Sequence, residues 1–405
     1  MEFDIAVIGS GPAGLAAAYA ALTAGKTCIV LEKQPLPGMK LLASGGGRCN
    51  VTNALDLEDF AAKFGRNWRF LLPALEKFHG RTLLDFFNTN HVPLTLSDGF
   101  HYFPASGKAR DVLELFTKEI IRRHGTILTG IKVNKLVPGD IWQLSTDRGT
   151  YRAKQVVCAC GGRGYPALGG SCAGYELVKS LGHTVTALYP AMTGVVCADL
   201  RIGEYAGLSI DDCIAEIAVK GKDRLSARGE LLFTHRGFSA FAILDLAGKV
   251  AQLLDKNDSV PLKIDFLPQY TSAELQAEFA AWRKTGGTKH ISTLLSKFLP
   301  RKLALLILDG DDPEISRWQS ASSETLLQKL KGSVFQLSGV ENWEKAMVTM
   351  GGVSLKEVSP HTLESKLFPG LFFAGEMLDV TGPCGGFNIS WALASGMLAG
   401  SAAQK

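Results

Sequence analysis

The sequence predicts an α/β fold in which both ends of the chain build one domain and the middle of the chain is an insertion. Three observations predict it: an apolar strand that runs into a glycine-rich turn at the N-terminus, a second apolar segment ending in glycines at 155–162, and a third at 370–376. Glycines at a strand end let the backbone pass close to a bound group. We therefore expect three segments far apart in sequence to face one ligand in a discontinuous, Rossmann-like domain.

The N-terminal segment has the order of a dinucleotide-binding βαβ unit between Asp4 and Glu32. Gly9 turns the chain, Gly11 admits a pyrophosphate to the backbone amides, and Gly14 lets the helix lie close to the sheet. The unpaired amides and the dipole at the helix start favour the phosphates. The Glu32 carboxylate suits a ribose diol and repels a 2′-phosphate, so we expect FAD or NAD at this site and not NADP.

Composition sets the class of protein. The 405 residues are 46% hydrophobic and 20% charged, enough for two or three packed domains. The net charge of +4 is small and no long Lys/Arg run occurs, so neither nucleic acid nor an anionic membrane is implied. Because the first strand starts within a few residues of Met1, we expect no signal peptide, and no apolar run approaches the roughly 20 residues that span a bilayer. We expect a cytoplasmic protein with a small-molecule substrate, no nucleic-acid or membrane partner, and an oligomeric state that the sequence does not specify.

The cysteines are scattered among apolar neighbours, which is typical of reduced thiols and not of a disulfide framework. We expect Cys158 and Cys160 to alternate on one strand, too close along it for a good disulfide. The absence of a Cys-x-x-Cys pair argues against a disulfide reductase, and no spacing of zinc-ligand type occurs. We therefore expect no metal site.

The insertion has its own texture. Its first half alternates in the manner of β-strands at 214–220 and 230–234, and its second half is helical, with Ser272 as an N-cap. These boundaries predict a cofactor-binding domain of residues 1–190 plus 345–405, a β-rich domain of residues 191–270 and 339–344, and a helical subdomain of residues 271–338.

The second strong signal is Ser44–Asn53, which reads Ser-Gly-Gly-Gly-Arg-Cys-Asn-Val-Thr-Asn. Consecutive glycines beside a cation and amide side chains suit a pyrophosphate and the edge of an isoalloxazine. A flexible surface turn is the alternative. We expect Arg48 to contact FAD at the flavin edge, although it could also be a solvated turn charge.

The third signal is the loop from Gly375 to Asn388. A helix that starts near Phe387 aims its N-terminal amides at the N1–C2=O region of a flavin, where negative charge gathers on reduction. Cys384 in this loop is either an active-site thiol or a small residue in a turn.

The polar candidates for substrate chemistry are His101, Tyr102, His235 and Arg236. We take His235 and Arg48 as the catalytic candidates. We expect the substrate pocket between the flavin and the insertion, near the loop 381–388, with Phe238 and Phe241 as apolar wall.

The expected cofactor contacts come from these segments and their neighbours: Gly9, Ser10, Gly11, Pro12, Ala13, Gly14, Glu32, Lys33, Lys40, Ser44, Gly46, Gly47, Arg48, Cys49, Asn50, Val133, Ala159, Cys160, Gly161, Gly375, Glu376, Asp379, Gly386, Phe387, Asn388 and Ile389.

On these motifs, together with Gly229–Gly237 and Gly351–Glu376, the chain resembles the FAD-dependent oxidoreductase group that includes aminoacetone oxidase and the BaiN-type bile-acid reductases. The resemblance covers nearly the whole length. It implies a two-segment FAD domain, an inserted β-barrel-like domain and a helical subdomain over the flavin. The chain departs from the group at His101, where relatives have Arg, at Cys160, where they have Thr, and at 240–241, where they have Gly-Pro.

The first hypothesis is an oxidoreductase whose noncovalent FAD exchanges hydride with a small or medium-sized organic substrate. The redox partner is NAD(P)H, docking transiently because no second dinucleotide motif is visible, or O₂. The second hypothesis is a flavin-binding sensor or interaction protein in which FAD is structural. An RNA-modifying flavoenzyme is disfavoured by the weak net charge.

Overall fold

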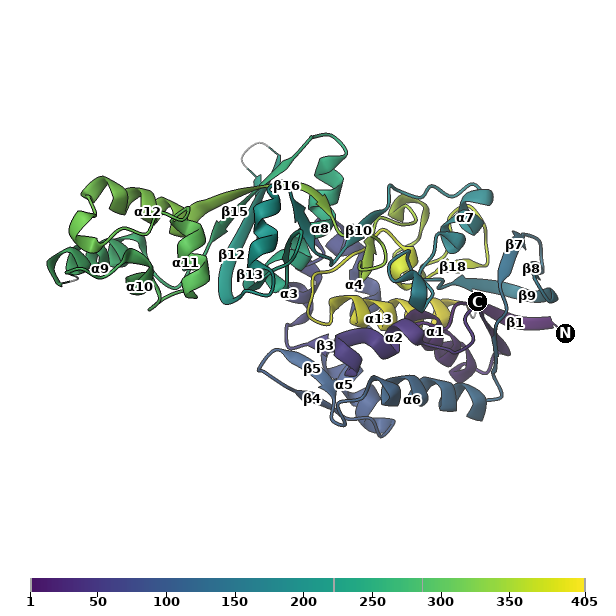
Figure 1. Cartoon of the computed structure of the whole chain (residues 1–405). Helices are drawn as coiled ribbons and strands as arrows, with labels where there is room; N and C mark the ends of the chain where they lie inside the picture. The colour runs from purple at the N-terminus through teal and green to yellow at the C-terminus, as the bar shows by residue number, and fades with distance from the viewer. Residues whose placement is uncertain (1, 221–222, 286, 404–405) are drawn as a thin grey trace. The chain divides into compact units, whose positions relative to one another are not determined.

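The computed structural model describes residues 2–220, 223–285 and 287–403, which form two compact units (Figure 1). The first unit combines the chain up to Tyr189 with the chain from Val348 onward. The second unit is Pro190–Met347. Each is described by itself below.

A seven-stranded sheet forms the centre of the first unit, with strand order β6-β2-β1-β9-β8-β7 and β18 paired to β9. Strands β1, β2, β6, β9 and β18 run parallel, while β7 and β8 join antiparallel. Parallel strands end at one edge of a sheet, which is where open α/β sheets bind ligands. The strands are β1 (Glu2–Ile8), β2 (Cys28–Glu32), β6 (Thr126–Thr129), β7 (Val133–Val137), β8 (Trp142–Thr146), β9 (Gly149–Cys158) and β18 (Leu371–Phe373).

The first and last helices of the chain, α1 (Pro12–Thr23) and α13 (Phe387–Ala402), pack against each other (Figure 1). Both are mostly buried and rich in small residues. A Cβ on Gly396 would lie 2.2 Å from the Ala13 carbonyl oxygen, and one on Gly400 would lie 2.1 Å from that of Ala17. The two helices therefore meet at backbone distance, which joins the two sequence segments of this unit.

A small antiparallel sheet, in the order β3-β5-β4, accompanies the central sheet. Its strands are β3 (Thr52–Asn53), β4 (Leu94–Leu96) and β5 (His101–Pro104). The other helical segments of the unit are α2 (Met39–Ala43), η1 (Ser44–Gly47), α3 (Leu57–Ala62), η2 (Gly65–Asn67), α4 (Trp68–Leu75), α5 (Gly80–Thr89), α6 (Ala109–Arg122), η3 (Pro166–Leu168), α7 (Ala173–Ser180), η6 (Leu355–Glu357) and η7 (Gly375–Met377). Near the unit boundaries lie β10 (Tyr189–Ala191) and β17 (Val348–Met350).

The second unit contains a closed six-stranded barrel in the order β11-β14-β13-β12-β15-β16. Its strands are β11 (Val195–Cys197), β12 (Ser209–Lys220), β13 (Asp223–Phe233), β14 (Gly237–Ser239), β15 (Val260–Asp265) and β16 (Ser333–Val340). The barrel shares one apolar core with the helices of this unit. These are η4 (Leu200–Tyr205), α8 (Phe241–Leu254), α9 (Ser272–Thr285), α10 (Ile291–Leu295), α11 (Arg301–Ile307), η5 (Ile315–Arg317) and α12 (Ser320–Gly332).

The predicted fold class is confirmed: a discontinuous Rossmann-type domain, an inserted barrel and a helical part. Three local expectations were wrong. The helical stretch ends at Gly332, and 333–338 belongs to β16, whose alternating burial completes the barrel. Thr271, and not Ser272, caps α9: its hydroxyl accepts from the Glu274 N–H while the Glu274 carboxylate accepts from the Thr271 N–H. Cys160 lies beyond the end of β9 and does not alternate with Cys158 on it.

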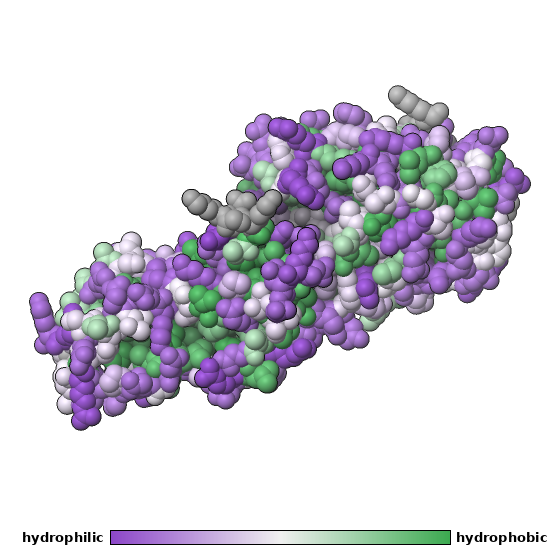
Figure 2. Space-filling model, turned by 90° about the horizontal axis from the view of Figure 1, so that it is seen from above, coloured by the Kyte–Doolittle hydropathy of each residue, from purple (hydrophilic) through white to green (hydrophobic). Residues whose placement is uncertain are grey.

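The face of the molecule shown in Figure 2 is mostly hydrophilic, with apolar side chains in small separate groups. In the part of the chain that the structure describes, no helix is long and apolar enough to cross a membrane.

Candidate active site

Three turns meet where the parallel strands of the first unit end. The Ala159 N–H donates to the Ile8 carbonyl and the Ala374 N–H donates to the Cys158 carbonyl, so the ends of β1, β9 and β18 lie side by side. A Cβ on Gly9 would lie 2.4 Å from the Ala159 carbonyl oxygen. The three glycine-bearing segments expected from the sequence therefore converge on one edge of the sheet.

The glycines of the first turn have separate structural reasons. Gly9 has φ +102°, and a Cβ on Gly14 would lie 1.9 Å from the Gly9 carbonyl oxygen, so neither position has room for a side chain. Gly11 differs: its φ is −70° and a Cβ there meets nothing within 4 Å. Helix α1 also has no side-chain cap and no acidic residue in its first turn. Its N-terminal amides and dipole therefore face open space that suits a diphosphate.

Glu32 is buried and braces this turn. Its Oε2 accepts from the Ser10 N–H at 2.8 Å and from the Ser10 hydroxyl at 2.7 Å, and its Oε1 accepts from the Gln34 N–H at 2.8 Å. Next to it, Lys33 donates to the Ser171 hydroxyl, and burial lowers the pKa of its ammonium group. A carboxylate has about four acceptor sites, so Glu32 keeps capacity for a ribose hydroxyl.

The Ser44–Asn53 segment folds as a left-handed glycine turn. Gly45, Gly46 and Gly47 have φ of +56°, +65° and +87°, a run that residues with a Cβ rarely adopt. A Cβ on Gly46 or Gly47 meets nothing within 4 Å, so this side of the turn is open. Cys49 lies below it, fully buried, with its N–H donating to the Ser44 carbonyl.

The two asparagines of this segment join it to the C-terminal loop. The Asn53 amide donates to the Gly385 carbonyl at 2.8 Å. With the Asn50 amide oriented to satisfy its neighbours, its nitrogen donates to the Thr52 and Tyr102 carbonyls and its oxygen accepts from the Gly386 N–H at 3.1 Å. The sequence did not reveal this role for Asn53, because the partner loop is far along the chain.

The C-terminal loop closes on Asn388, whose amide oxygen accepts from the Gly382 N–H and whose nitrogen donates to the Gly382 carbonyl, both at 2.9 Å. Helix α13 starts at Phe387, as the sequence predicts, without a side-chain cap or an acidic residue in its first turn. The Phe387 ring is buried and stacks on Phe60 at 4.7 Å, so only its backbone is available to a ligand. Ile389 follows on the same helix and is half-buried.

Glu376 connects the middle and last segments. Its carboxylate accepts from Lys40 at 2.9 Å and from the Thr349 N–H at 2.7 Å. A Cβ on Gly162 would lie 2.3 Å from its Oε1, which explains the second glycine of that pair. The first, Gly161, has φ +71° and open space at its Cβ position.

Asp379 belongs to the C-terminal loop and contacts η2. Burial raises the pKa of its carboxyl, which the nearby Arg66 guanidinium and the Thr186 hydroxyl oppose. The Asn67 amide donates to the Asp379 carbonyl at 3.1 Å. Arg66 therefore brings positive charge to this part of the site.

Arg48 and His101 both lie near the Phe103 ring. The Arg48 guanidinium is 4.4 Å from the Phe103 ring centroid, and the His101 ring is 6.3 Å from it. The Arg48 side chain is exposed, and its Nε donates to the Gly45 carbonyl at 3.4 Å. Tyr102 lies between His101 and Phe103 on β5 and is half-buried.

The other expected cofactor residues fall into two groups. Pro12, Ala13, Ser44, Ala159, Cys160 and Gly375 belong to the three turns or to the helices that start from them. Val133 lies on β7 and is buried in the sheet, next to the segment whose Ile131 N–H donates to the Glu32 carbonyl. Cofactor contact by each of these residues stays a prediction.

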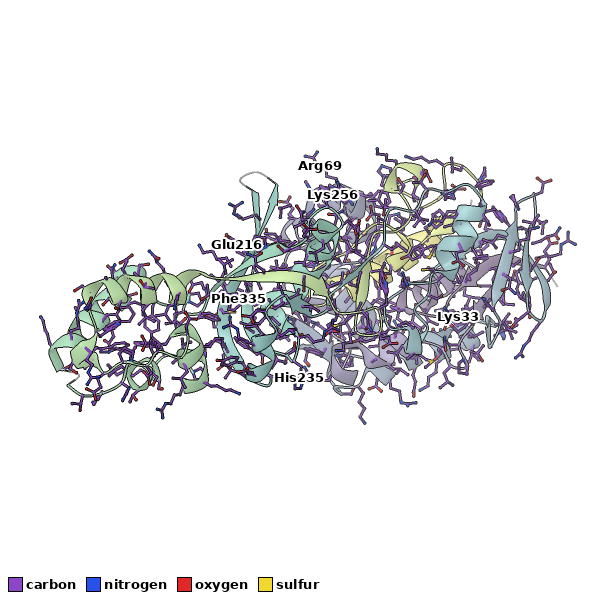
Figure 3. All side chains as sticks on the ribbon, turned by 45° about the horizontal axis from the view of Figure 1, so that its top comes forward. Lys33, Arg69, Glu216, His235, Lys256 and Phe335 are labelled. Atoms are coloured by element: carbon purple, nitrogen blue, oxygen red, sulfur yellow. The ribbon has the colours of Figure 1, made fainter. Side chains whose placement is uncertain are left out.

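His235 lies in the second unit, exposed on the turn between β13 and β14 (Figure 3). Arg236 beside it is 3.9 Å from Glu341. Phe238, expected to be pocket wall, is instead fully buried in the barrel core, in edge contact with Phe233 and Phe335. Phe241 is 51% exposed and is available as wall.

The second unit also contains a cavity of about 150 Å³. It is lined by Met192, Thr193, Gly194, Thr234, Ser239, Leu244, Glu341, Lys345 and Met347. Among the described residues, the buried Thr193 hydroxyl has no hydrogen-bond partner. His235 is not part of this lining.

A Ser–His–Glu arrangement in the first unit has the geometry of a hydrolase triad but serves packing. His183 Nδ1 is 3.0 Å from Glu357 Oε2, and its Nε2 is 2.9 Å from the Ser365 hydroxyl. The His183 side chain has no exposure, and the Ser365 oxygen already accepts from two backbone N–H groups. A nucleophile needs access to substrate, which this serine lacks.

Thiol and metal chemistry find little support in the part of the chain that the structure describes. The eight cysteines form no disulfide in the described residues, and burial raises the pKa of Cys49 and Cys160 to about 12. No group of three His, Cys, Asp or Glu residues there is arranged to hold a metal ion.

The residues present fit FAD. Four glycines, at positions 11, 46, 47 and 161, leave open space where a Cβ would stand, and two uncapped helix starts supply amide donors without a competing carboxylate. A buried acid stands at the end of β2, where a ribose binds in this fold. The fold and the site define a Rossmann-type, FAD-dependent oxidoreductase.

The chain belongs to the family described as HI0933-like protein Rossmann domain, which matches residues 3–402. It is 31% identical over 409 residues to a 3-dehydro-bile acid delta(4,6)-reductase of Clostridium scindens, covering 99% of each chain. It is 29% identical over 407 residues to a ribosomal RNA dihydrouridine synthase of Escherichia coli, covering 97% of this chain and 96% of the other. The resemblance to the FAD-dependent group with bile-acid reductases is confirmed.

Solved structures share the fold at low identity. A 3-ketosteroid delta1-dehydrogenase of Sterolibacterium denitrificans has a TM-score of 0.54 at 13% identity, with all of both chains covered. A 3-ketosteroid-delta4-(5alpha)-dehydrogenase of Rhodococcus jostii has a TM-score of 0.51 at 17% identity, covering 100% of this chain and 97% of the other.

Proposed function

We propose that this protein is an FAD-dependent reductase that uses NAD(P)H to saturate a carbon–carbon double bond conjugated to a carbonyl group. The observation that carries the proposal is the convergence of open glycine turns and two uncapped helix starts at one sheet edge. That arrangement supports a bound flavin, and bound FAD supplies hydride transfer.

The substrate class follows from what two relatives have in common. A delta(4,6)-reductase of a 3-dehydro bile acid acts on double bonds that are conjugated to a 3-oxo group. Dihydrouridine is uridine with its ring double bond saturated next to a carbonyl. Both names therefore describe hydride addition to an electron-poor C=C bond, although the two molecules are otherwise unlike.

Residues of this chain can polarise such a carbonyl. The exposed Arg48 guanidinium, fixed by its contact with Phe103, offers N–H donors and positive charge. In the proposed reaction it stabilises negative charge that develops on the carbonyl oxygen. A catalytic role for His235 stays a prediction.

The test is anaerobic mixing of the purified enzyme with NADH or NADPH, followed by addition of a 3-oxo-Δ4 steroid, 2-cyclohexenone or uridine, with flavin absorbance as readout. We expect bleaching by one nicotinamide and recovery with an enone. Arg48→Ala should slow recovery about 10²-fold or more, as loss of an oxyanion donor does. Arg110→Ala, which removes an exposed cation on α6, is the matched control.

Other outcomes identify the rival functions. Bleached enzyme that recovers only with O₂ is an oxidase, and enzyme that no nicotinamide or organic substrate bleaches is a sensor with structural FAD. Either result contradicts the reductase proposal.

A second candidate is uridine reduction within RNA. One surface favours it: exposed Lys63, Arg66 and Arg69 follow each other closely, Arg69 lies 5.2 Å from the half-buried Trp68 ring (Figure 3 labels Arg69), and Arg66 acts on Asp379 in the site. Cations next to an aromatic ring suit a nucleic-acid strand. The predicted absence of a nucleic-acid partner therefore stays a prediction. A salt-sensitive gel shift with ribosomal RNA that Arg69→Glu abolishes would favour RNA, and an unshifted RNA favours a free small molecule.

A further inference from the structure

Beside the C-terminal loop, a histidine and an aspartate form a pair that the proposed function leaves unused. His101 Nδ1 lies 2.7 Å from Asp98 Oδ2. The other carboxylate oxygen, Oδ1, accepts from the His101 N–H at 2.8 Å and from the Phe100 N–H at 3.1 Å. Asp98 is thus held by three hydrogen bonds and in turn fixes the orientation of the imidazole.

The free nitrogen of the imidazole points to the candidate flavin site. A Cβ built on Gly385 would lie 3.4 Å from His101 Nε2, so this nitrogen faces the turn that leads into α13. Strand β5 holds it there by pairing with β3, where His101 lies opposite Asn53. Asn53 itself donates to the Gly385 carbonyl. These contacts place Nε2 beside the loop that we expect to meet the flavin pyrimidine ring.

The surroundings of the pair suit proton delivery. The His101 side chain is 25% exposed, so bulk water can restore its proton, and Asp98 is 56% exposed. The His101 ring lies near the Phe100 and Phe103 rings. The charged and titratable groups around His101 are Asp98 on its own turn, Arg48 in contact with the Phe103 ring, Tyr102 on the same strand and Cys384 next to Gly385.

We propose that His101, oriented by Asp98, is the proton donor of the reduction, an assignment that rests on the proposed function. Saturating an enone adds one hydride and one proton. Bound FAD would supply the hydride, taken from NAD(P)H; this hydride would form a C–H bond at the β-carbon while the π electron pair moves toward the carbonyl to give an enolate. The His101 Nε2–H bond then breaks, its proton forms the C–H bond at the α-carbon, and neutral imidazole takes a new proton from water. The Asp98 carboxylate accepts a hydrogen bond from Nδ1–H, so Nε2, the nitrogen that faces the site, carries a proton in the imidazolium form, and the neutral imidazole left after the transfer keeps its N–H at Nδ1.

The first arm of the test needs no substrate. Histidine side chains labelled with ¹⁵N are observed by NMR in the apoprotein and after addition of FAD. We expect the His101 ring signals to shift on FAD binding and those of His91, an exposed histidine of the same unit, to stay in place. Asp98→Asn should change the His101 ring signals in the apoprotein as well. A His101 signal that FAD leaves unmoved overturns the proposal, whatever the substrate is.

The second arm separates the two half-reactions in the holoenzyme. We expect His101→Gln to slow transfer to an enone about 10²- to 10⁴-fold, the usual contribution of a general acid, and far more than it slows bleaching by NAD(P)H. We expect the wild-type rate of transfer to the enone to fall as the pH rises, and we expect this fall to be absent in His101→Gln. Asp98→Asn should have a smaller effect of the same kind, and His91→Gln none.

The outcomes distinguish this inference from the proposed function. If wild-type enzyme reduces an enone and His101→Gln does so at the same rate with the same pH profile, His101 is not the donor. If the wild-type enzyme reduces no enone, the proposed function fails, and the NMR arm alone decides whether the pair faces the cofactor.

Discussion

Glu32 combines two tasks that a motif search merges into one. Its carboxylate holds the Ser10 N–H and hydroxyl, which shapes the glycine turn, and the same carboxylate stands where the adenosine ribose is expected. The sequence predicts the second task from the position of the acid at a strand end. It does not predict the first, because a hydroxyl two residues before a proline has no distinctive pattern.

We expect Glu32→Ala to weaken FAD binding by about 1 to 3 kcal/mol, the value of hydrogen bonds to a charged group. Ser10→Ala removes one of the bracing bonds but leaves the carboxylate, so its effect should be smaller. Titration of the apoprotein with FAD, followed by flavin fluorescence, measures both. An unchanged FAD affinity in Glu32→Ala would count against ribose contact. Equal losses of FAD affinity in the two variants would show that Glu32 acts only by holding Ser10 and the glycine turn.

Gly11 and Gly14 make a sharper pair, because one faces open space and the other faces backbone. Gly11→Val should leave the apoprotein folded, since φ is −70° and a Cβ there meets no atom within 4 Å, yet abolish FAD retention by filling the pyrophosphate space. Gly14→Ala should destabilise the fold itself, since its Cβ would collide with the Gly9 carbonyl oxygen. Thermal unfolding of the apoproteins and the flavin content of the purified enzymes check both. A Gly11→Val enzyme that stays yellow would place the pyrophosphate elsewhere.

At the scale of elements, the α1 and α13 contact joins the two sequence segments of the first unit. Gly396→Val places a branched side chain against the Ala13 carbonyl, 2.2 Å from where the first side-chain carbon would stand. We expect a loss of at least about 1 to 3 kcal/mol in the free energy of unfolding, the usual cost of overpacking, since backbone cannot yield as a side chain does. Chemical denaturation measures it.

Ser401→Val is the matched control for this substitution. Ser401 is exposed on the same helix, so the variant has the same β-branched penalty in a helix without the collision. Equal losses in the two variants would show that helix propensity, and not contact between α1 and α13, sets the cost.

The same elements show what the sequence could predict. The opening βαβ unit and the start of α13 follow local rules of glycine, helix and strand, and they are confirmed. Residues 333–338 form a strand because they pair with β15 and β11. The side-chain hydrogen bonds of Asn50 and Asn53 are made to a loop more than 300 residues away. Such long-range pairings leave no local signature, so these features could not be predicted.

At the scale of the whole molecule, one buried histidine links fold stability to pH. His79 is 7% exposed, lies 4.1 Å from the Phe60 ring that stacks on Phe387, and has Nε2 3.3 Å from the Leu55 carbonyl oxygen. Its Nδ1 has no partner in the described part of the chain. Burial therefore lowers the pKa of His79 below its usual 6.5, partly opposed by the Leu55 carbonyl.

The sign of the effect follows from linkage. Since the unfolded chain binds the His79 proton more tightly than the folded protein, this residue favours folding above about pH 6.5, and the advantage is lost as pH falls through the lower folded pKa. We expect wild-type stability to drop between pH 7.5 and 5 more steeply than that of His79→Phe, which keeps the aromatic contact without titrating. Each unit of pKa difference corresponds to about 1.4 kcal/mol. Denaturation curves across this range measure the difference between the two slopes, which cancels groups common to both proteins.

His91→Phe, at an exposed position, should follow the wild type, and parallel curves for wild type and His79→Phe would show that the buried imidazole does not set the pH dependence.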